Sequence, residues 1–391
     1  MPPNGRQQSK KQVRVTLFDE QQWAPQATAA RRRTRSRGVV TGIWAFVIAL
    51  VALLGMSLLP SPYVIERPGP VYNTIGEVTD DDDTSVPLIS VSGAETFPTA
   101  GALDLLTVQV IGTPERPNTW LDIATAWFDG SKAVVPIEQI YPSGQTSDQR
   151  NQENTLLMTD SQMDATAAAL IHLGYDVVPQ VTVSSVVDGS AADGVLQSGD
   201  VLVTANGTKL TDATALRSIV QEGAGAPVTI DLRRDGGETS VQLTPIAGTG
   251  DAAGTWKIGV VLQNSYAFPL DVSFALDNVG GPSAGMMFAL GIIDTLTPGE
   301  LNGGRQVAGT GTIAADGTVG PIGGIRQKMW GAERAGAEYF LAPNSNCSEV
   351  SGHVPSGLRV FSVSTLDDAL AALDAISSGG DLDALPTCAA G

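Results

Sequence analysis

The chain has 391 residues and a formal net charge of −18. This length is enough for two or three domains with a substantial core. The charge is uneven: residues 1–38 carry nine Lys or Arg against Asp19 and Glu20, which makes +7 and leaves −25 for the rest. The acidic remainder has no basic patch interleaved with aromatic residues, which argues against nucleic acid as a partner. A basic head on an acidic body indicates that the two parts face different compartments.

An uncharged segment follows the basic head. Val39 to Leu59 contains 21 residues without a charge, and as a helix this segment would be about 31 Å long, which matches a hydrocarbon core. We predict a transmembrane helix over residues 39–59, with residues 1–38 as a cytoplasmic tail, because arginines cluster at the N-terminal end. The rest of the chain would lie outside the cell membrane. The alternative is a cleaved signal peptide, which would need a small-x-small site that Ser57 to Pro62 lacks.

Two features of residues 60–87 indicate little regular structure. The prolines in Tyr63 to Asn73 do not fit a regular helix, so residues 60–87 are predicted to form an extended stem. Asp80 to Asp83 is interpreted as a solvated turn, since neither the Gly nor the distal Glu of a calcium loop follows.

Beyond the stem, the pattern of predicted secondary structure changes twice. Residues 88–175 contain strand-like segments such as Leu103 to Val110, and then Asp160 to Leu173 with apolar residues at helical spacing. Residues 176–247 switch to short strands and tight turns around a helix-like Asp212 to Glu222. We therefore predict a β-rich domain next to segments of α/β (α+β) character. It is inserted in a larger α/β domain if Leu103 to Val110 and the helix at Asp160 to Leu173 pack with the strands that follow residue 247.

Ser283 lies at the mouth of a long apolar segment. Gly280-Gly281-Pro282-Ser283-Ala284-Gly285 runs directly into Met286 to Ile293, which predicts a buried helix. The first backbone N–H groups of a helix have no intrahelical partner and can hold an oxyanion, so Ser283 can be a nucleophile with the N–H groups of Ser283 and Ala284 as oxyanion donors. The alternative is that Ser283 is only an N-cap.

Lys328 lies on a small, apolar helix face. The residues three and four positions away are Gly324, Ile325, Gly331 and Ala332. A buried lysine loses hydration, which lowers its pKa toward the range that a general base needs. The alternative is a lysine that extends its ammonium to water.

These motifs carry a resemblance. The segment from about Asp277 to Asn346, with GGPSAG, VAGTGTI and GTVGPIGGIRQK, resembles the peptidase domain of the Lon proteases, which use a Ser/Lys dyad. The resemblance implies Ser283 as nucleophile, Lys328 as base and Thr310 as a hydroxyl bonded to that lysine, with residues 255–376 as the peptidase core. Many Lon enzymes carry an acidic residue at the position of Gly280, so an accessory carboxylate is not implied.

A second resemblance concerns the inserted domain. Residues 176–247, and SAADGVLQSGDVLVTANG in particular, resemble a PDZ domain of the bacterial protease-associated kind. Such domains hold a peptide C-terminus at a sheet edge, in a loop of backbone N–H groups. Leu173, Gly174 and Tyr175 are the candidates for that loop, with a helix C-cap at Gly174 as the alternative. The segment after the anchor is similar to that of membrane-bound, PDZ-containing Lon-like proteases (the YlbL type).

Cysteine, histidine and phosphate-binding motifs add few constraints. Cys347 and Cys388 fall on the outer side, where a disulfide persists, although the sequence does not show that they meet. His172 and His353 have no zinc spacing around them, and no G-x-x-x-x-G-K-[ST] loop occurs. We predict no metal, no cofactor and no ATPase motor within this chain. Residues 377–391 are predicted to be a loosely ordered tail.

The predicted function is that of a membrane-anchored, ATP-independent serine endopeptidase. Its partners would be peptide or unfolded protein substrates and C-terminal peptides. The sequence leaves open whether the protein forms a homo-oligomer. One alternative is an α/β-hydrolase, since Gly281 to Gly285 also fits G-x-S-x-G and Asp316 and His353 follow in order. Against it, Pro282 directly precedes the serine. The other alternative is an inactive PDZ scaffold.

Overall fold

The computed structural model describes residues 37–79, 83–248, 254–276 and 279–388. The chain divides into two units, Met1–Gly55 and Met56–Gly391. Helix α1 (Arg37–Leu58) starts in the first unit and ends three residues past the boundary. Its segment Gly38–Leu58 is 21 residues long with a mean hydropathy of 2.5 and is 0% buried, so its length and composition suit a membrane span. The predicted apolar helix is present, whereas the predictions for residues 1–36 lie outside the described residues.

The larger sheet of the second unit has six strands, in the order β20-β19-β16-β5-β1-β6. Strands β5, β16, β19 and β20 pair in parallel, and β1 and β6 join as antiparallel strands. The bounds of these strands are β1 (Tyr63–Asn73), β5 (Ala102–Ile111), β6 (Ala133–Pro136), β16 (Gln306–Gly309), β19 (Tyr339–Pro343) and β20 (Arg359–Val363). Strands from both sides of the inserted domain therefore build one sheet, as the prediction of an insertion requires.

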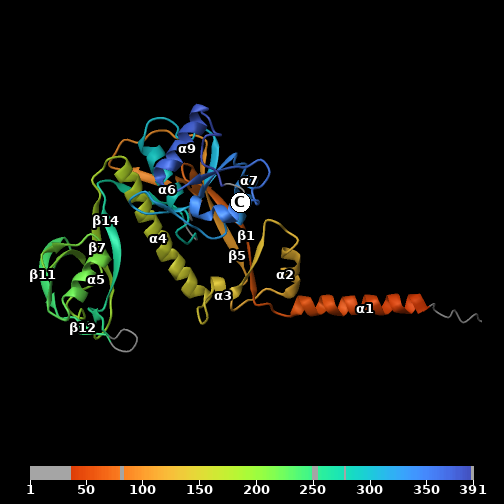
Figure 1. Ribbon diagram of the computed structural model, residues 1–391, viewed down its shortest axis with the longest axis horizontal. Coiled ribbons are helices and arrows are strands. Elements are labelled where there is room, and N and C mark those ends of the chain that lie inside the picture. The colour runs from red at the N-terminus through yellow and green to blue at the C-terminus, as the bar shows by residue number, and fades with distance from the viewer. Residues whose placement is uncertain (1–36, 80–82, 249–253, 277–278, 389–391) are drawn as a thin grey trace, which may run out of the picture. The chain divides into compact units, whose positions relative to one another are not determined.

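Helices cover both faces of this sheet (Figure 1). One face packs against α4 (Ser147–His172), α6 (Gly285–Leu296) and α9 (Leu366–Ser378), and the other against α7 (Ile325–Ala335). Helix α6 is the centre of the core, because all ten residues from Gly285 to Asp294 are buried. Such a helix, apolar on all sides, is stable only when other elements surround it.

The predicted stem at residues 60–87 is wrong. Strand β1 lies inside the sheet, between β5 and β6. Its two prolines are tolerated because the pairing with β5 shifts between Pro68 and Val71, and a bulge is where a strand can hold residues without a ladder hydrogen bond.

Helix α4 is longer than predicted. It begins at Ser147 rather than Asp160, and a capping box joins Thr146 and Gln149 at its start. Its first two turns are mostly exposed and polar, so apolar periodicity could not reveal them.

The second sheet has the order β11-β10-β8-β7-β14 and its own core. Its elements are β7 (Val178–Val186), β8 (Val201–Ala205), β9 (Thr208–Lys209), α5 (Ala213–Glu222), β10 (Val228–Arg234), β11 (Gly237–Leu243) and β14 (Val260–Ala267). Strand β14 pairs with β7 along eight residues, so the domain continues past the predicted boundary at residue 247.

The remaining elements are short. They are β2 (Glu77–Thr79), β3 (Ser85–Pro87), β4 (Ile89–Ser92), α2 (Trp120–Ala126), α3 (Ile137–Ile140), β12 (Ile246–Ala247), β13 (Trp256–Lys257), β15 (Asp271–Phe274), β17 (Thr312–Ile313), β18 (Val319–Gly320), η2 (Asn344–Asn346) and α8 (Cys347–Val350).

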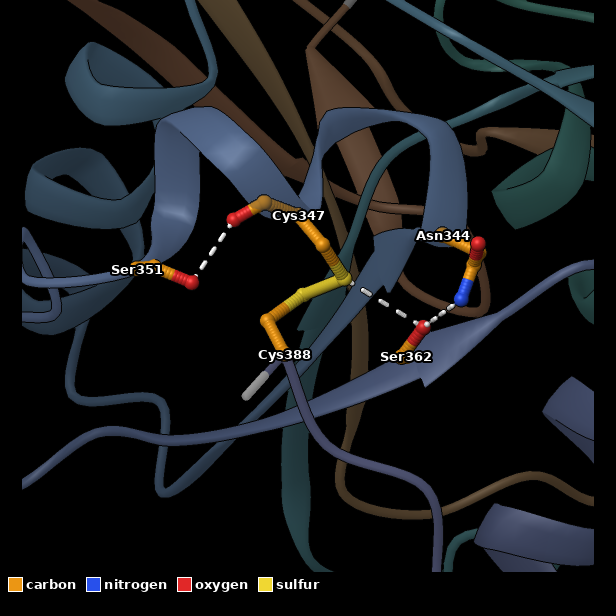
Figure 2. Close-up of a disulfide and its surroundings, with 5 residues drawn as sticks. All are labelled: Asn344, Cys347, Ser351, Ser362 and Cys388. Carbon is orange, nitrogen blue, oxygen red and sulfur yellow. Dashed lines mark hydrogen bonds between the residues drawn. A yellow bond between two sulfur atoms is a disulfide. The ribbon is translucent and has the colours of Figure 1, made fainter. Parts of the chain in front are cut away.

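The C-terminal tail is anchored, which corrects the prediction of a loose segment. Cys388 forms a disulfide with Cys347 (Figure 2). The Ser362 N–H of edge strand β20 donates to the Pro386 carbonyl of the tail at 2.8 Å. Arg359 also pairs with Asp383 at 2.5 Å. The disulfide closes a loop with a sequence separation of 41, and restricting the unfolded chain in this way stabilises a fold by up to about 4 kcal/mol.

Candidate active site

Ser283 lies in the turn immediately before α6. The turn is set by Gly281, which has a φ of +89°, a conformation that glycine adopts without steric cost. The N-cap of α6 is Ala284, without a side-chain cap hydrogen bond. Ser283 therefore does not cap the helix, and its hydroxyl is free for another partner.

That partner is Lys328. Its side-chain nitrogen Nζ donates to Ser283 Oγ at 2.7 Å. Lys328 lies in α7 and Ser283 just before α6, 45 positions apart in the sequence. The side chain of Lys328 is among the largest fully buried ones and the residue is 2% exposed. Burial lowers the pKa of Lys328 to about 7 because the interior disfavours the charged ammonium. The alternative of an ammonium that reaches water is excluded.

Thr310, which follows β16, completes the cluster. Its hydroxyl donates to the Ser283 carbonyl at 2.9 Å and accepts from Lys328 Nζ at 2.9 Å. A hydroxyl has one hydrogen, so donation to the carbonyl turns its lone pairs toward Lys328. The structure thus brings together Ser283, Lys328 and Thr310.

The predicted oxyanion donors are unoccupied. Among the described residues, no hydrogen bond uses the N–H of Ser283, Ala284 or Gly285, whereas the Met286 N–H donates to the Gly311 carbonyl at 3.1 Å. An oxyanion hole needs N–H groups without an internal partner beside the nucleophile, and the N–H groups of Ser283 and Ala284 meet this requirement.

A pocket of about 430 Å³ opens beside Ser283 and Lys328. The second half of β5 forms one wall, with Leu106, Thr107, Val108, Gln109 and Val110. On its β16 side, β5 is paired only at Ala102–Leu105 within the described residues. An unpaired strand edge therefore faces the pocket, and such an edge can take up an extended peptide.

Comparison with known proteins agrees with this geometry. Residues 277–375 match the family described as the Lon protease (S16) C-terminal proteolytic domain. The C-terminal part of this chain is therefore similar to the proteolytic domain of the Lon proteases. Residues 182–234 match the PDZ domain family. The chain thus combines a serine-peptidase domain with a PDZ domain, in the mixed α/β fold predicted from the sequence.

Curated proteins that are similar to this chain include Lon proteases. Lon protease 1 of Sorangium cellulosum is 40% identical over 94 residues, which are 23% of this chain and 11% of the relative. The Lon protease of Chloroflexus aggregans is 28% identical over 178 residues, 38% of this chain and 21% of the relative. The chain therefore spans only a small part of the length of the relatives that it matches.

Solved structures are similar to about a fifth of this chain. The PDZ domain of the SdrC-like protein of Listeria monocytogenes is 24% identical, with a TM-score of 0.20, covering 21% of this chain and 85% of that one. A protein of Geobacillus thermodenitrificans, solved in solution, is 25% identical with a TM-score of 0.19, covering 21% and 94%.

Gly280, where many Lon-type domains carry an acidic residue, has a local reason. A Cβ at Gly280 would lie 2.7 Å from the Asn154 Cβ on α4, which is too close without a shift. The passage of α4 over this turn therefore leaves no room for a side chain at position 280.

The predicted peptide-binding loop of the PDZ domain is wrong. The N–H groups of Leu173, Gly174 and Tyr175 donate to the carbonyls of Ala169, Ile171 and Leu170 at 3.0, 3.0 and 2.9 Å. They cap the C-terminus of α4, with Gly174 at a φ of +81°, and are not free to hold a carboxylate.

A better peptide-binding candidate is the edge strand β14, which the prediction missed. Strand β14 ends the sheet, and helix α5 lies beside it, where the Ala213 N–H donates to Asn264 Oδ1 at 3.0 Å. The strand is preceded by Gly259, which has a φ of +80°. A glycine turn directly before an apolar strand was the signal, but it lay outside the predicted domain.

The α/β-hydrolase alternative is not supported. The Asp316 carboxylate accepts from the Thr318 N–H at 2.9 Å, and His353 Nδ1 lies 3.0 Å from the Ser351 carbonyl. Both residues bond within their own exposed turns, and within the described part of the chain neither bonds to Ser283.

Proposed function

We propose that this protein is a serine endopeptidase that cleaves peptides with the dyad Ser283 and Lys328. The observation that supports it most is the 2.7 Å contact between Ser283 Oγ and a buried Lys328 Nζ whose pKa is lowered to about 7. At neutral pH about half of such lysines are neutral, and a neutral amine accepts the serine proton across the same contact.

Each residue then has one role in acyl transfer. Ser283 Oγ attacks the scissile carbonyl while Lys328 takes the hydroxyl proton, and the oxyanion lies at the N–H groups of Ser283 and Ala284. Lys328 returns the proton to the leaving amine. In the second half of the reaction, Lys328 takes a proton from the water that attacks the acyl carbonyl and gives it to Ser283 Oγ as the acyl group leaves. Thr310 holds one Nζ hydrogen, so the nitrogen lone pair faces Ser283.

This function is tested with an unfolded protein substrate. The purified protein should cleave it, and Ser283→Ala should not. Equal cleavage by both would show that the activity belongs to a contaminant or to another site. If neither cleaves but the PDZ domain binds peptide, the inactive scaffold is the better reading.

Thr310→Val should reduce kcat/KM by about 5- to 150-fold, the equivalent of about 1 to 3 kcal/mol for a buried hydrogen bond left unmade. Valine matches threonine in shape, so the loss reflects the hydroxyl. Thr295→Val is the matched control, because the Thr295 hydroxyl donates only to the Gly291 carbonyl of its own helix. A Thr310→Val enzyme as fast as the Thr295→Val control would remove Thr310 from the mechanism.

We further propose that the PDZ domain recruits protein C-termini through β14 and α5. Val260 and Leu262 of β14 are partly buried against the domain core. Within the described residues the other edge of β14 pairs with no strand, so it offers main-chain hydrogen bonds to an added peptide strand. Backbone N–H groups at the Gly259 turn would then be near the terminal carboxylate.

Gly259→Ala should slow the cleavage of protein substrates about tenfold or more and leave short C-terminally blocked peptides unaffected. An alanine Cβ at this positive φ would collide with the Ser190 side chain. Gly207→Ala is the control, because Gly207 has a similar φ of +76° and open space around it. If both substrate classes slow equally with Gly259→Ala, the domain supports the fold of the peptidase rather than recruitment.

Membrane anchoring and independence from ATP also belong to this proposal. Helix α1 supports the anchor, and Trp127, which is 67% exposed, is of a residue type enriched at membrane interfaces. The sequence contains no phosphate-binding loop, so ATP should not change the rate at which unfolded substrates are cleaved.

The proposed topology places Ser283 outside the cytoplasm. A protease added to intact spheroplasts should digest the body and spare a short N-terminal fragment. A body that stays fully protected until the membrane is permeabilised would reverse the orientation.

A further inference from the structure

Helix α4 makes two hydrogen bonds to the turn that presents Ser283. The Gly281 N–H donates to the Asn154 carbonyl at 2.8 Å, and the Ser161 hydroxyl donates to the Pro282 carbonyl at 3.0 Å. Asn154 and Ser161 are seven positions apart, which is about two helical turns, so they lie on the same side of α4. The backbone on both sides of Pro282 is thus held to one helix.

Ser161 is not explained by its own helix. It is 4% exposed in a segment otherwise rich in buried alanine, where an unpaired hydroxyl would be costly. Serine and threonine inside helices commonly donate to the carbonyl four residues earlier, as Thr166 does to Gln162 at 2.8 Å. Ser161 instead donates to a carbonyl 121 positions away.

The bonded carbonyl shares a peptide plane with a catalytic N–H. The Pro282 carbonyl and the Ser283 N–H belong to one planar peptide unit, and in the trans form they point in opposite directions. Fixing the carbonyl toward Ser161 therefore fixes the N–H away from it. That N–H has no hydrogen-bond partner among the described residues, so it stays available to a substrate oxygen.

We propose that Ser161 is a positioning residue that aims the Ser283 N–H at the oxyanion of the transition state. The inference rests on the proposed peptidase function and adds a residue that touches neither substrate nor dyad. Oxyanion donors act because they are already oriented before charge develops. Without the Ser161 hydrogen bond, the Pro282–Ser283 peptide can rotate, and the donor loses its fixed direction.

The test separates orientation from folding by comparing kcat, KM and inhibitor affinity in the full chain. Ser161→Ala should lower kcat by about 10- to 100-fold, less than the 10²- to 10³-fold typical of deleting a donor, with KM within about twofold. A peptide boronate, whose tetrahedral oxygen would occupy the oxyanion hole, should lose affinity by the same factor as kcat.

Two variants serve as controls. Ser161→Thr keeps the hydroxyl and should recover most of kcat, and Thr166→Val removes a buried hydroxyl that bonds only within α4 and should leave kcat unchanged. Rates are divided by the concentration of sites titrated with a fluorophosphonate, so a misfolded fraction does not count.

The outcomes are distinct. If Ser161→Ala keeps wild-type kcat and boronate affinity, or if only KM rises, the positioning role is wrong while the peptidase function stands. If Ser161→Ala and Thr166→Val fall alike, the loss reflects packing in α4, and the positioning role is again wrong. If the wild-type protein shows no cleavage that depends on Ser283, the proposed function fails, and the role of Ser161 fails with it.

Discussion

Lys328→Met should remove at least about 10⁴-fold of kcat/KM, the scale seen when a member of a catalytic unit is deleted. Methionine has nearly the length of lysine, so it fills the buried site without a cavity but cannot accept a proton. The variant should also resist heat at least as well as the wild type at pH 8. Burial lowers the pKa of Lys328 to about 7 in the folded protein. Between this pKa and the higher pKa of the unfolded chain, the unfolded state binds more protons, which destabilises the wild-type fold. Methionine does not titrate, so the variant lacks this destabilisation.

Ser283→Ala should have the same effect on kcat/KM, and the double variant should be no slower than either single one. Residues that act in one step are non-additive, because losing either already removes the step. Lys132→Met is a matched control, since Lys132 lies at the surface beside Asp129 at 3.1 Å. An active Lys328→Met enzyme, or losses that add in the double variant, would contradict a shared Ser/Lys mechanism.

The second large effect is on pH dependence. Only the neutral form of Lys328 can accept the serine proton, so kcat/KM should rise about tenfold per pH unit below pH 7 and level off above it. With a pKa of about 7, the fraction of neutral lysine rises about 100-fold between pH 5 and pH 9. The measurement is kcat/KM on a short peptide over this range, with folding monitored at each pH.

Glu66 is the control for that profile, because it also lines the pocket. Burial, and then the nearby charge of Glu349, raises the pKa of Glu66. Glu66→Gln should leave the midpoint near pH 7 in place if Lys328 sets it. A profile that falls with pH, or a midpoint that disappears with Glu66→Gln, would point to a different titrating group.

The cluster of Ser283, Lys328 and Thr310 could be predicted because each lies in a long motif whose order along the chain is informative. The surface around it could not. Ser161 resembles any other helical serine in the sequence, and its meaning depends on a contact 121 positions away. Gly280 likewise becomes understandable only once α4 is seen to cross it.

The errors in the fold have related causes. The prolines in β1 suggested a stem, because proline is normally excluded from the interior of a paired strand. The bulge near Pro68 lets β1 keep its prolines and still pair with β5. Strand β14 returns to the inserted sheet after a break in the pattern, and pairing between distant segments cannot be read from local periodicity. For Gly174, by contrast, local rules allowed both a peptide-binding loop and a helix C-cap, and the structure shows the C-cap.

The site of fluorophosphonate labelling tests the central claim most directly. After reaction of the full chain at pH 8, peptide mass spectrometry should place one adduct on Ser283, and the labelling rate should fall at least about 10³-fold in Lys328→Met. An adduct on another serine, or labelling of Ser283 at an unchanged rate in Lys328→Met, would contradict activation of Ser283 by Lys328.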